Sequence, residues 1–283
     1  MPALQELFIE GALPTYDSSI HSLYPPSDAR KVLLLNVKHL RLGGRMLDVA
    51  LTLSHLEALM MNTLGLAVIP DDDDEQLEME QFFRVVCDHM VQAGQYLPVE
   101  EIHISNDAEF YLSASPDSSQ YGDVYFEFGH SDVDKPAIVH HFLETLPFCP
   151  ILRAEISGME FYMTDWFEAF GDSDGNASSI SCLSIKGRLL DEFCYFFADS
   201  DPELDTPPAE LELPLQGLES LEIQGHCFRP LYVRHLLLET LQTRKEQGIS
   251  VEWLKFTRCL SLDFGWLDEL KDIVPEVKVE RRS

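Results

Sequence analysis

Histidine and glutamate side chains fall at helical spacing at two places in the sequence. His140, His141 and Glu144 lie within one expected helix, and His235 and Glu239 are four residues apart. Neither set forms the H-E-x-x-H pattern that holds zinc, and no further ligand is implied elsewhere. We therefore expect neither a metal ion nor another cofactor in this protein.

A thiol and an imidazole are neighbours at His226 and Cys227. Neighbouring side chains of an extended segment point to opposite faces, so this pair is not a nucleophile with its base. The sequence also lacks the phosphate-binding loop, the G-x-G-x-x-G fingerprint and the G-x-S-x-G elbow. Residues 172–175 open like a calcium loop, but its twelfth position, where calcium needs Glu, is Leu183, which indicates a turn. We expect no catalytic residues.

Apolar residues, in contrast, recur in a six-residue frame of the form L-x-x-L-x-L, most clearly at Leu218, Leu221 and Ile223. Such a frame repeated every ~20–50 residues is typical of solenoids, and leucine-rich repeats contain this core. The frames predict strands near residues 4–9, 37–42, 61–66, 99–104, 121–126, 151–156, 180–185, 218–223, 251–256 and 274–279.

The frame has a simple physical meaning. Alternate side chains of a strand point to opposite faces, so the fourth and sixth positions of each frame point into the core. One such unit cannot bury its own apolar face, so the units must stack. We therefore predict one domain over residues 1–283: an α/β leucine-rich-repeat-like solenoid with irregular repeats and a largely parallel sheet on the concave face. The alternative is two α+β domains meeting near residues 105–120.

Several connecting segments have sequence signals of their own. Residues 31–42 are expected to be one strand that ends at Gly43-Gly44, and residues 110–114 and 121–128 are expected to form a hairpin. Helical periodicity is longest over residues 228–247 and stops at Gly248. The acidic run at residues 71–75 is typical of a solvated loop before a helix. No helical cap precedes Leu4, which indicates the later part of something longer or an unusual start.

Charge is distributed unevenly in this acidic chain, whose formal net charge is −29. Residues 226–283 contain ten basic and nine acidic residues, so residues 1–225 account for a net charge of −30. Such a field repels nucleic acid and anionic membranes; it favours a basic protein partner or serves solubility. No secretory signal and no membrane-length apolar stretch is apparent, and no C-x-x-C pair occurs, so we expect a cytoplasmic or nuclear protein.

The outward positions of the frames are the candidate binding residues. In a parallel stacked sheet, the fifth positions form one line across the exposed face, and the third positions flank that line. Aromatic residues and arginine are enriched among binding hot spots. The sites we predict for a protein partner are therefore Arg41, His103, Tyr125, Arg153, Glu155, Trp253 and Lys255.

The C-terminal segment resembles a known family. Residues 237–248 (LLETLQTRKEQG), 251–259 (VEWLKFTRC) and 267–277 (LDELKDIVPEV) look like the last repeats of the fungal F-box/leucine-rich-repeat-like family. The resemblance implies a substrate-recognition role in a ubiquitin ligase, in which an F-box binds a Skp-type adaptor and the repeats hold the target. We find no F-box in this sequence. The expectation that remains is a non-catalytic protein-interaction module, which could be a ligase receptor or a fragment of one. The alternative is a structural scaffold or an α/β enzyme of unknown reaction.

Overall fold

The structure is a computed structural model that describes most of the chain. The residues described are 4–15, 30–58, 61–69, 75–92, 99–106, 109–115, 123–129, 134–145, 148–158, 162–170, 180–186, 190–197 and 214–280. The acidic residues 71–74 and residues 172–175, which are predicted to form a turn, lie outside these ranges. The chain divides into two compact units, residues 1–149 and residues 150–283, and each is described by itself.

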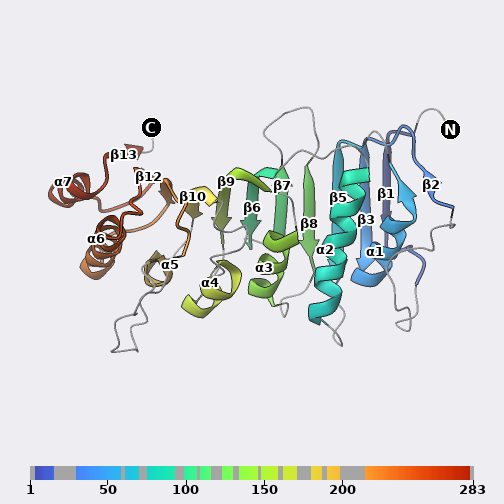
Figure 1. The fold of residues 1–283 in the computed structure, drawn as a ribbon, viewed down its shortest axis with the longest axis horizontal. Helices are drawn as coiled ribbons and strands as arrows, with labels where there is room; N and C mark the ends of the chain where they lie inside the picture. The colour runs from blue at the N-terminus through green and yellow to red at the C-terminus, as the bar shows by residue number, and fades with distance from the viewer. Residues whose placement is uncertain are drawn as a thin grey trace. The chain divides into compact units, whose positions relative to one another are not determined.

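The described residues of the N-terminal unit form a sheet of six strands and three helices, which can be followed in Figure 1. Its sheet follows the spatial order β1-β3-β5-β8-β7-β6. These strands are β1 (Glu6–Glu10), β3 (His39–Arg45), β5 (Thr63–Ile69), β6 (Val99–Ser105), β7 (Phe110–Ser115) and β8 (Val124–Phe128). The helices are α1 (Met46–Ser54), α2 (Glu75–Gln92) and α3 (Lys135–Thr145). Two short parallel strands, β2 (Val32–Leu33) and β4 (Leu56–Glu57), form a separate pair.

Strand pairing follows the apolar frames position by position. Leu40 of β3 lies opposite Leu7 of β1 and Leu64 of β5, and Leu64 lies in turn opposite Val124 of β8. Leu40, Leu64 and Val124 are each 1% exposed. Since burying such a side chain stabilises the fold by about 1.5–3 kcal/mol, the apolar alternation fixes this register strongly.

The order of strands departs from simple stacking in one place. After β5 and α2, the chain does not add the next strand beside β5 but three positions away, at β6. It then returns through β7, which is antiparallel to both β6 and β8, and β8 takes the place beside β5. The frame strands of this unit still run parallel to one another, with β7 inserted as the one antiparallel strand.

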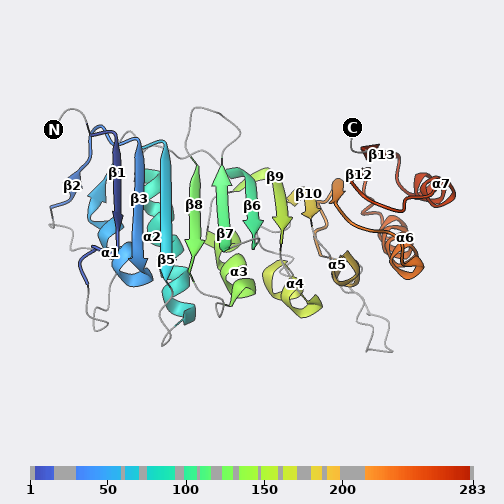
Figure 2. The same ribbon diagram turned by 180° about the vertical axis from the view of Figure 1, so that it is seen from behind.

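Aromatic side chains join the helices of the N-terminal unit to its sheet. Phe82 and Phe83 of α2 pack edge-on against Phe126 of β8, with ring centroids 6.0 and 5.2 Å away, and Phe142 of α3 packs 5.7 Å from Phe126. These rings are fully buried. The helices lie on one face of the sheet and leave the other face to the strands, which Figure 2 shows from the strand side. In each unit, this helix-free face corresponds to the face predicted to be concave.

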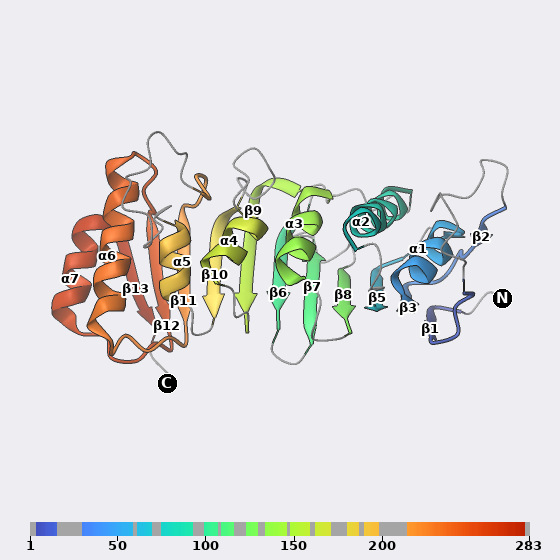
Figure 3. The same cartoon turned by 90° about the horizontal axis from the view of Figure 1, so that it is seen from below.

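The C-terminal unit is the more regular of the two. Its strands β9 (Phe148–Ser157), β10 (Ile180–Lys186), β11 (Ser220–Gln224), β12 (Trp253–Thr257) and β13 (Glu276–Glu280) are all parallel and follow chain order. A helix connects each pair, namely α4 (Met163–Phe170), α5 (Leu190–Phe197), α6 (Leu231–Glu246) and α7 (Phe264–Ile273). Figure 3 shows these helices side by side over one face of the strands.

Register in this unit again follows the frames. Leu221 of β11 lies opposite Leu183 of β10 and Leu254 of β12, and Ile223 two residues on lies opposite Phe256. The thiol of Cys259, just beyond β12, donates to the Ile223 carbonyl at 3.2 Å and extends the contact past the strand ends. The interior is therefore built in layers, one side chain per strand in each layer.

Local sequence signals mark the ends of the last two helices. Gly248, with φ of +80°, follows α6 as expected, because glycine adopts the left-handed conformation without steric cost. Asp263 caps α7 by accepting a hydrogen bond from the Trp266 N–H at 2.9 Å, and this bond lowers the pKa of the Asp263 carboxyl. Val274 ends α7 and precedes Pro275, which cannot continue a helix.

The prediction of one strand over residues 31–42, ended by Gly43-Gly44, is wrong. The structure has two strands there, β2 and β3, and both glycines lie inside β3. Gly43 pairs with Glu10 and Ala67, and a Cβ atom at Gly43 would come within 2.9 Å of the Glu10 side chain. Glycine at this position therefore permits close strand packing and does not end the strand.

The predicted α/β class with largely parallel strands is confirmed within each unit. None of the helices in the described ranges is long and apolar enough to cross a membrane. The predicted hairpin is present as β7 and β8. It lies inside the N-terminal unit, and the two units meet in sequence at residues 149 and 150 rather than near 105–120. A single domain over the whole chain stays a prediction.

Candidate interaction surface

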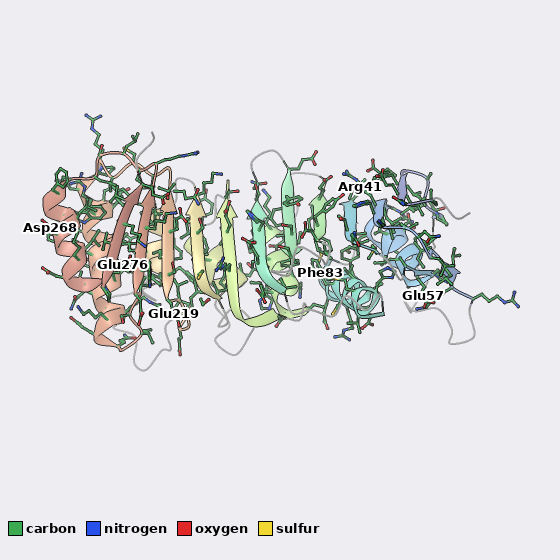
Figure 4. All side chains as sticks on the ribbon, turned by 90° about the horizontal axis from the view of Figure 1, so that it is seen from above. Arg41, Glu57, Phe83, Glu219, Asp268 and Glu276 are labelled. Carbon is green, nitrogen blue, oxygen red and sulfur yellow. The ribbon has the colours of Figure 1, made fainter. Side chains whose placement is uncertain are left out.

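The helix-free face of each sheet is the candidate interaction surface. It is formed by the outward side chains of the strands, which alternate with the buried frame residues. Figure 4 shows this division in the N-terminal unit, where Arg41 projects from the strands and Phe83 lies on α2. The predicted residues fall on this face, three in the N-terminal unit and four in the C-terminal unit.

Arg41 is at the centre of an acidic cluster in the N-terminal unit. Its Nη2 donates to Glu127 Oε2 at 2.9 Å, and its Nε lies 2.5 Å from Glu10 Oε1 as an ion pair without hydrogen-bond alignment. Burial lowers the pKa of Arg41, but the two carboxylates outweigh burial and raise it. Both glutamates come from strands next to or near β3, so three strands meet in this cluster.

Tyr125 lies across a glycine on the neighbouring strand. Gly65 is directly opposite Tyr125, and a Cβ atom at Gly65 would overlap the tyrosine ring and hydroxyl. The ring also stacks on Tyr111 of β7 with centroids 6.2 Å apart. Burial is the main cause that raises the pKa of Tyr111. The glycine thus leaves room on the sheet for the ring of Tyr125.

His103 does not adjoin Tyr125 as the simple strand order predicts. Strand β7 separates them, and Ser113 lies opposite both His103 and Tyr125. The predicted line across this unit is therefore present, but it has an extra member and its order is changed. It runs Phe8, Arg41, Gly65, Tyr125, Ser113, His103.

The predicted lines of the C-terminal unit are in register. Glu155 begins one line, which continues through Ser184, Glu222, Lys255 and Lys278. Arg153 begins the flanking line, which continues through Cys182, Ser220, Trp253 and Glu276. Arg153 and Glu155 are thus three strands away from Trp253 and Lys255, so the four predicted residues share a face but are not one cluster.

Trp253 is the exposed aromatic side chain of the C-terminal face. It is 45% exposed, and the Lys278 ammonium lies 4.2 Å from the centroid of its ring. A cation over an indole ring is attracted by the ring quadrupole and here holds the ring in place on the sheet. Trp253 is therefore an ordered apolar anchor, which is the kind of residue that dominates binding interfaces.

Lys255 is held between two carboxylates beside Trp253. Its Nζ lies 3.4 Å from Glu222 Oε1 and 3.2 Å from Glu280 Oε2. Burial lowers the pKa of Lys255, but both glutamates raise it by more, so its net pKa is raised. Glu222 also accepts a hydrogen bond from the Thr257 hydroxyl at 2.5 Å. This network fixes long side chains that would otherwise lose entropy on binding a partner.

The two faces differ in charge. The C-terminal face has four cations and four anions, namely Arg153, Lys186, Lys255, Lys278, Glu155, Glu222, Glu276 and Glu280. On the N-terminal face, the acidic residues Glu6, Glu10, Glu101 and Glu127 outnumber the basic residues Arg41 and Arg45. A partner therefore meets a balanced surface on one unit and an acidic surface on the other.

Several residues of the surface were not among the predicted ones. Tyr111 and Glu127 complete the Tyr125 and Arg41 clusters, and Glu280 completes the network at Lys255. Alternate residues of a strand share a face, so the residue two positions after the fifth residue of a frame also points outward. This rule predicts Glu127 and Glu280. Tyr111 lies on β7, which has no frame, so only the hairpin pairing reveals it.

The largest pKa shifts among the described residues lie away from this surface. In the part of the chain that the structure describes, no three His, Cys, Asp or Glu side chains are placed to hold a metal ion. The strongest pKa shifts belong to separate buried groups in the helix layers. Burial lowers the pKa of His89 on α2 to about 4 and that of Arg244 on α6 to about 9, and it raises the pKa of Cys194 on α5.

Comparison with known proteins identifies no relative: no family model matches the chain, and neither a curated protein nor a solved structure is similar to it.

Proposed function

We propose that this protein is a non-catalytic protein-interaction module that binds its partner on the helix-free face of its sheets. The observation that carries the proposal is the surface around Trp253. It has an exposed but ordered aromatic ring, flanked by Lys255 and Lys278, on a charge-balanced face of a chain whose net charge is −29. A face selected for solubility alone would be expected to follow the acidic bias of the chain.

The mode of recognition follows from the rigidity of this face. Side chains on neighbouring strands are held by ion pairs and ring contacts before a partner arrives, so binding orders few of them. Trp253 supplies apolar contact, and the charges around it supply specificity. On the N-terminal face, the acidic surroundings of Arg41 favour a basic partner segment.

The repeat character of the C-terminal unit supports a leucine-rich-repeat-like solenoid. Strands and helices alternate there in chain order, and Cys259 occupies the ninth position of its frame, where that repeat has Asn or Cys. A role in substrate recognition similar to that of F-box repeat proteins is consistent with this arrangement, in the cytoplasm or nucleus. Binding of a Skp-type adaptor is not part of the proposal, because the sequence offers no F-box for it.

Site-specific cross-linking tests the proposed face. A photoreactive residue at Lys255 should capture a defined partner from the source cell, whereas the same residue at Glu239, exposed on α6, should not. With that partner purified, Trp253→Ala should weaken binding about thirtyfold, which corresponds to ~2 kcal/mol. The matched control is Tyr232→Ala, which removes an aromatic ring of 58% exposure on α6 and should leave affinity unchanged. Equal effects of the two substitutions would refute the assignment.

A further inference from the structure

Strand β13 ends the sheet of the C-terminal unit. It pairs with β12 along one edge, and no other strand of the described residues pairs with it along the other. Its sequence alternates strictly, with Glu276, Lys278 and Glu280 on the helix-free face and two valines between them. An unpaired strand edge of this kind is a template for another strand.

The backbone groups at the free edge can be assigned from the hydrogen bonds at the two ends of the β12–β13 pair. The Glu276 N–H donates to the Glu252 carbonyl at 3.1 Å, and the Glu280 carbonyl accepts from the Arg258 N–H at 3.0 Å. Because alternate residues of a strand direct their backbone groups to opposite edges, Val277 and Val279 direct theirs away from β12. Pro275 has no N–H, so the free donors begin at Val277.

The side chains at this edge are also incompletely covered. Val277 and Val279 occupy the frame positions that are fully buried in β11 and β12, where Leu221, Ile223 and Phe256 are at most 1% exposed. In β13 the two valines remain only half-buried. An added strand with apolar residues opposite them would complete the layers that run through the unit.

We propose that β13 accepts a β-strand from a partner protein, whose outward residues are basic, acidic and basic opposite Glu276, Lys278 and Glu280. Opposite charges directly across a strand pair are stabilising, and like charges are destabilising. The residues between them in the partner are aliphatic or β-branched and lie against Val277 and Val279. Because the Glu-Lys-Glu pattern reads the same in both directions, a parallel and an antiparallel partner complement it equally.

In full overlap, the same charges disfavour a second copy of this chain as the occupant. Full antiparallel overlap of two β13 strands places Lys278 opposite Lys278 and Glu276 opposite Glu280. Parallel addition of β1 from another copy in the frame register places Glu6 opposite Glu276 and Glu10 opposite Glu280. Shifting the antiparallel overlap to pair Lys278 with Glu276 places Pro275 opposite Val279 and loses backbone bonds at both ends.

Two short capped peptides test the proposal on the full chain. One has the core Lys-Val-Glu-Val-Lys and the other has the core Glu-Val-Lys-Val-Glu, and their affinities are measured by fluorescence anisotropy. We expect the first to bind about tenfold more tightly. The variant Glu276→Lys/Lys278→Glu/Glu280→Lys should reverse this preference. The control Glu269→Lys, an exposed charge reversal on α7, should leave it unchanged.

Amide hydrogen exchange shows where the peptide binds. At saturation, exchange at Val277 and Val279 should slow at least tenfold, whereas the Lys278 amide, which already faces β12, should change little. A peptide N-methylated on its pairing edge should not bind. Equal affinity for the two peptides, tight binding of the N-methylated peptide, or unchanged exchange at both valines would overturn the proposal. Protection that grows with protein concentration and without peptide would identify a second copy as the occupant and overturn it as well. The exchange data from the wild-type chain decide the matter even if the triple variant fails to fold.

Discussion

Replacing Arg244 should destabilise the C-terminal unit severely, although this residue is a long cation on a helix with exposed neighbours. The side chain is completely buried. Its Nη1 donates to the carbonyls of Phe197 and Pro214 at 3.0 and 2.8 Å, and its Nη2 donates to the Leu215 carbonyl at 2.8 Å. Its guanidinium carbon lies 3.7 Å from the centroid of the Phe197 ring. Arg244 thus ties the end of α5 and the segment before β11 to α6.

The expected loss can be worked out from these contacts. Each hydrogen bond from a charged donor contributes about 1.5–3 kcal/mol, and Arg244→Met removes three of them. The substitution also removes the cost of burying a cation, which offsets part of this loss. Burial lowers the pKa of Arg244 to about 9, which is still well above neutral. We therefore expect a decrease of about 3–5 kcal/mol in the free energy of unfolding.

Urea unfolding at neutral pH, followed by circular dichroism, measures this loss. The matched control is Arg229→Met, which replaces an exposed arginine before α6 and should change the free energy of unfolding by less than about 0.5 kcal/mol. Arg244→Lys should fall between the two, because one ammonium cannot reach all three carbonyls. A loss below about 1 kcal/mol for Arg244→Met would refute the view that these three bonds hold the unit together.

Three further outcomes follow from buried and paired residues. Burial lowers the pKa of His89 in the folded state to about 4, below its ordinary value of 6.5. The stabilising contribution of His89 is therefore present above pH 6.5 and is lost as the pH falls towards 4. The free energy of unfolding of the wild type relative to His89→Gln should decrease by about 3 kcal/mol over that range in urea titrations. Gly65→Ala should displace the Tyr125 ring, which would be seen as lost nuclear Overhauser contacts to Tyr111. The free energy of unfolding should change by less than about 1 kcal/mol, because only the end of a flexible side chain must move. Leu221→Ala should lower the free energy of unfolding in urea by about 2–5 kcal/mol, because Leu221 is buried. Glu222→Ala should lower it by less than about 1 kcal/mol, because Glu222 is a partly exposed ion-pair partner. Equal losses would mean that the assigned strand phase is wrong.

Which faces of the strands are buried could be predicted from the sequence, because a period of two with large apolar residues admits only one burial pattern. The pairing of Leu221 with Leu183 and Leu254 is one consequence. The helix predicted over residues 228–247 is present as α6, but it begins at Leu231 because Pro230 precedes it. The prediction that it is the longest helix is wrong, since α2 is longer.

The remaining features depend on contacts between distant residues. The position of β6 three places away from β5 is decided by how the β6–β7–β8 hairpins pair, and no local signal in residues 99–128 encodes it. Arg244 is charged and lies on an amphipathic helix, which ordinarily indicates an exposed position; it is buried because three carbonyls from another part of the chain converge on it. Gly43-Gly44 was interpreted as a strand break, since the sequence does not show that Glu10 lies against Gly43.

Lys278 connects the two proposed surfaces, and this shared residue makes them separable by experiment. It lies over the Trp253 ring on the helix-free face, and it is also the central charge of the β13 edge. Trp253 itself is on β12 and has no place at the free edge, whereas Val279 directs its backbone to that edge and away from the indole. Trp253→Ala should therefore weaken only a partner on the face, and Val279→Pro, which removes a free N–H without removing a bond to β12, should weaken only an added strand. Lys278→Ala should weaken both. A partner that responds to Lys278→Ala and to neither of the other substitutions would show that the lysine recognises it as an isolated charge, and neither surface would then describe how this protein binds.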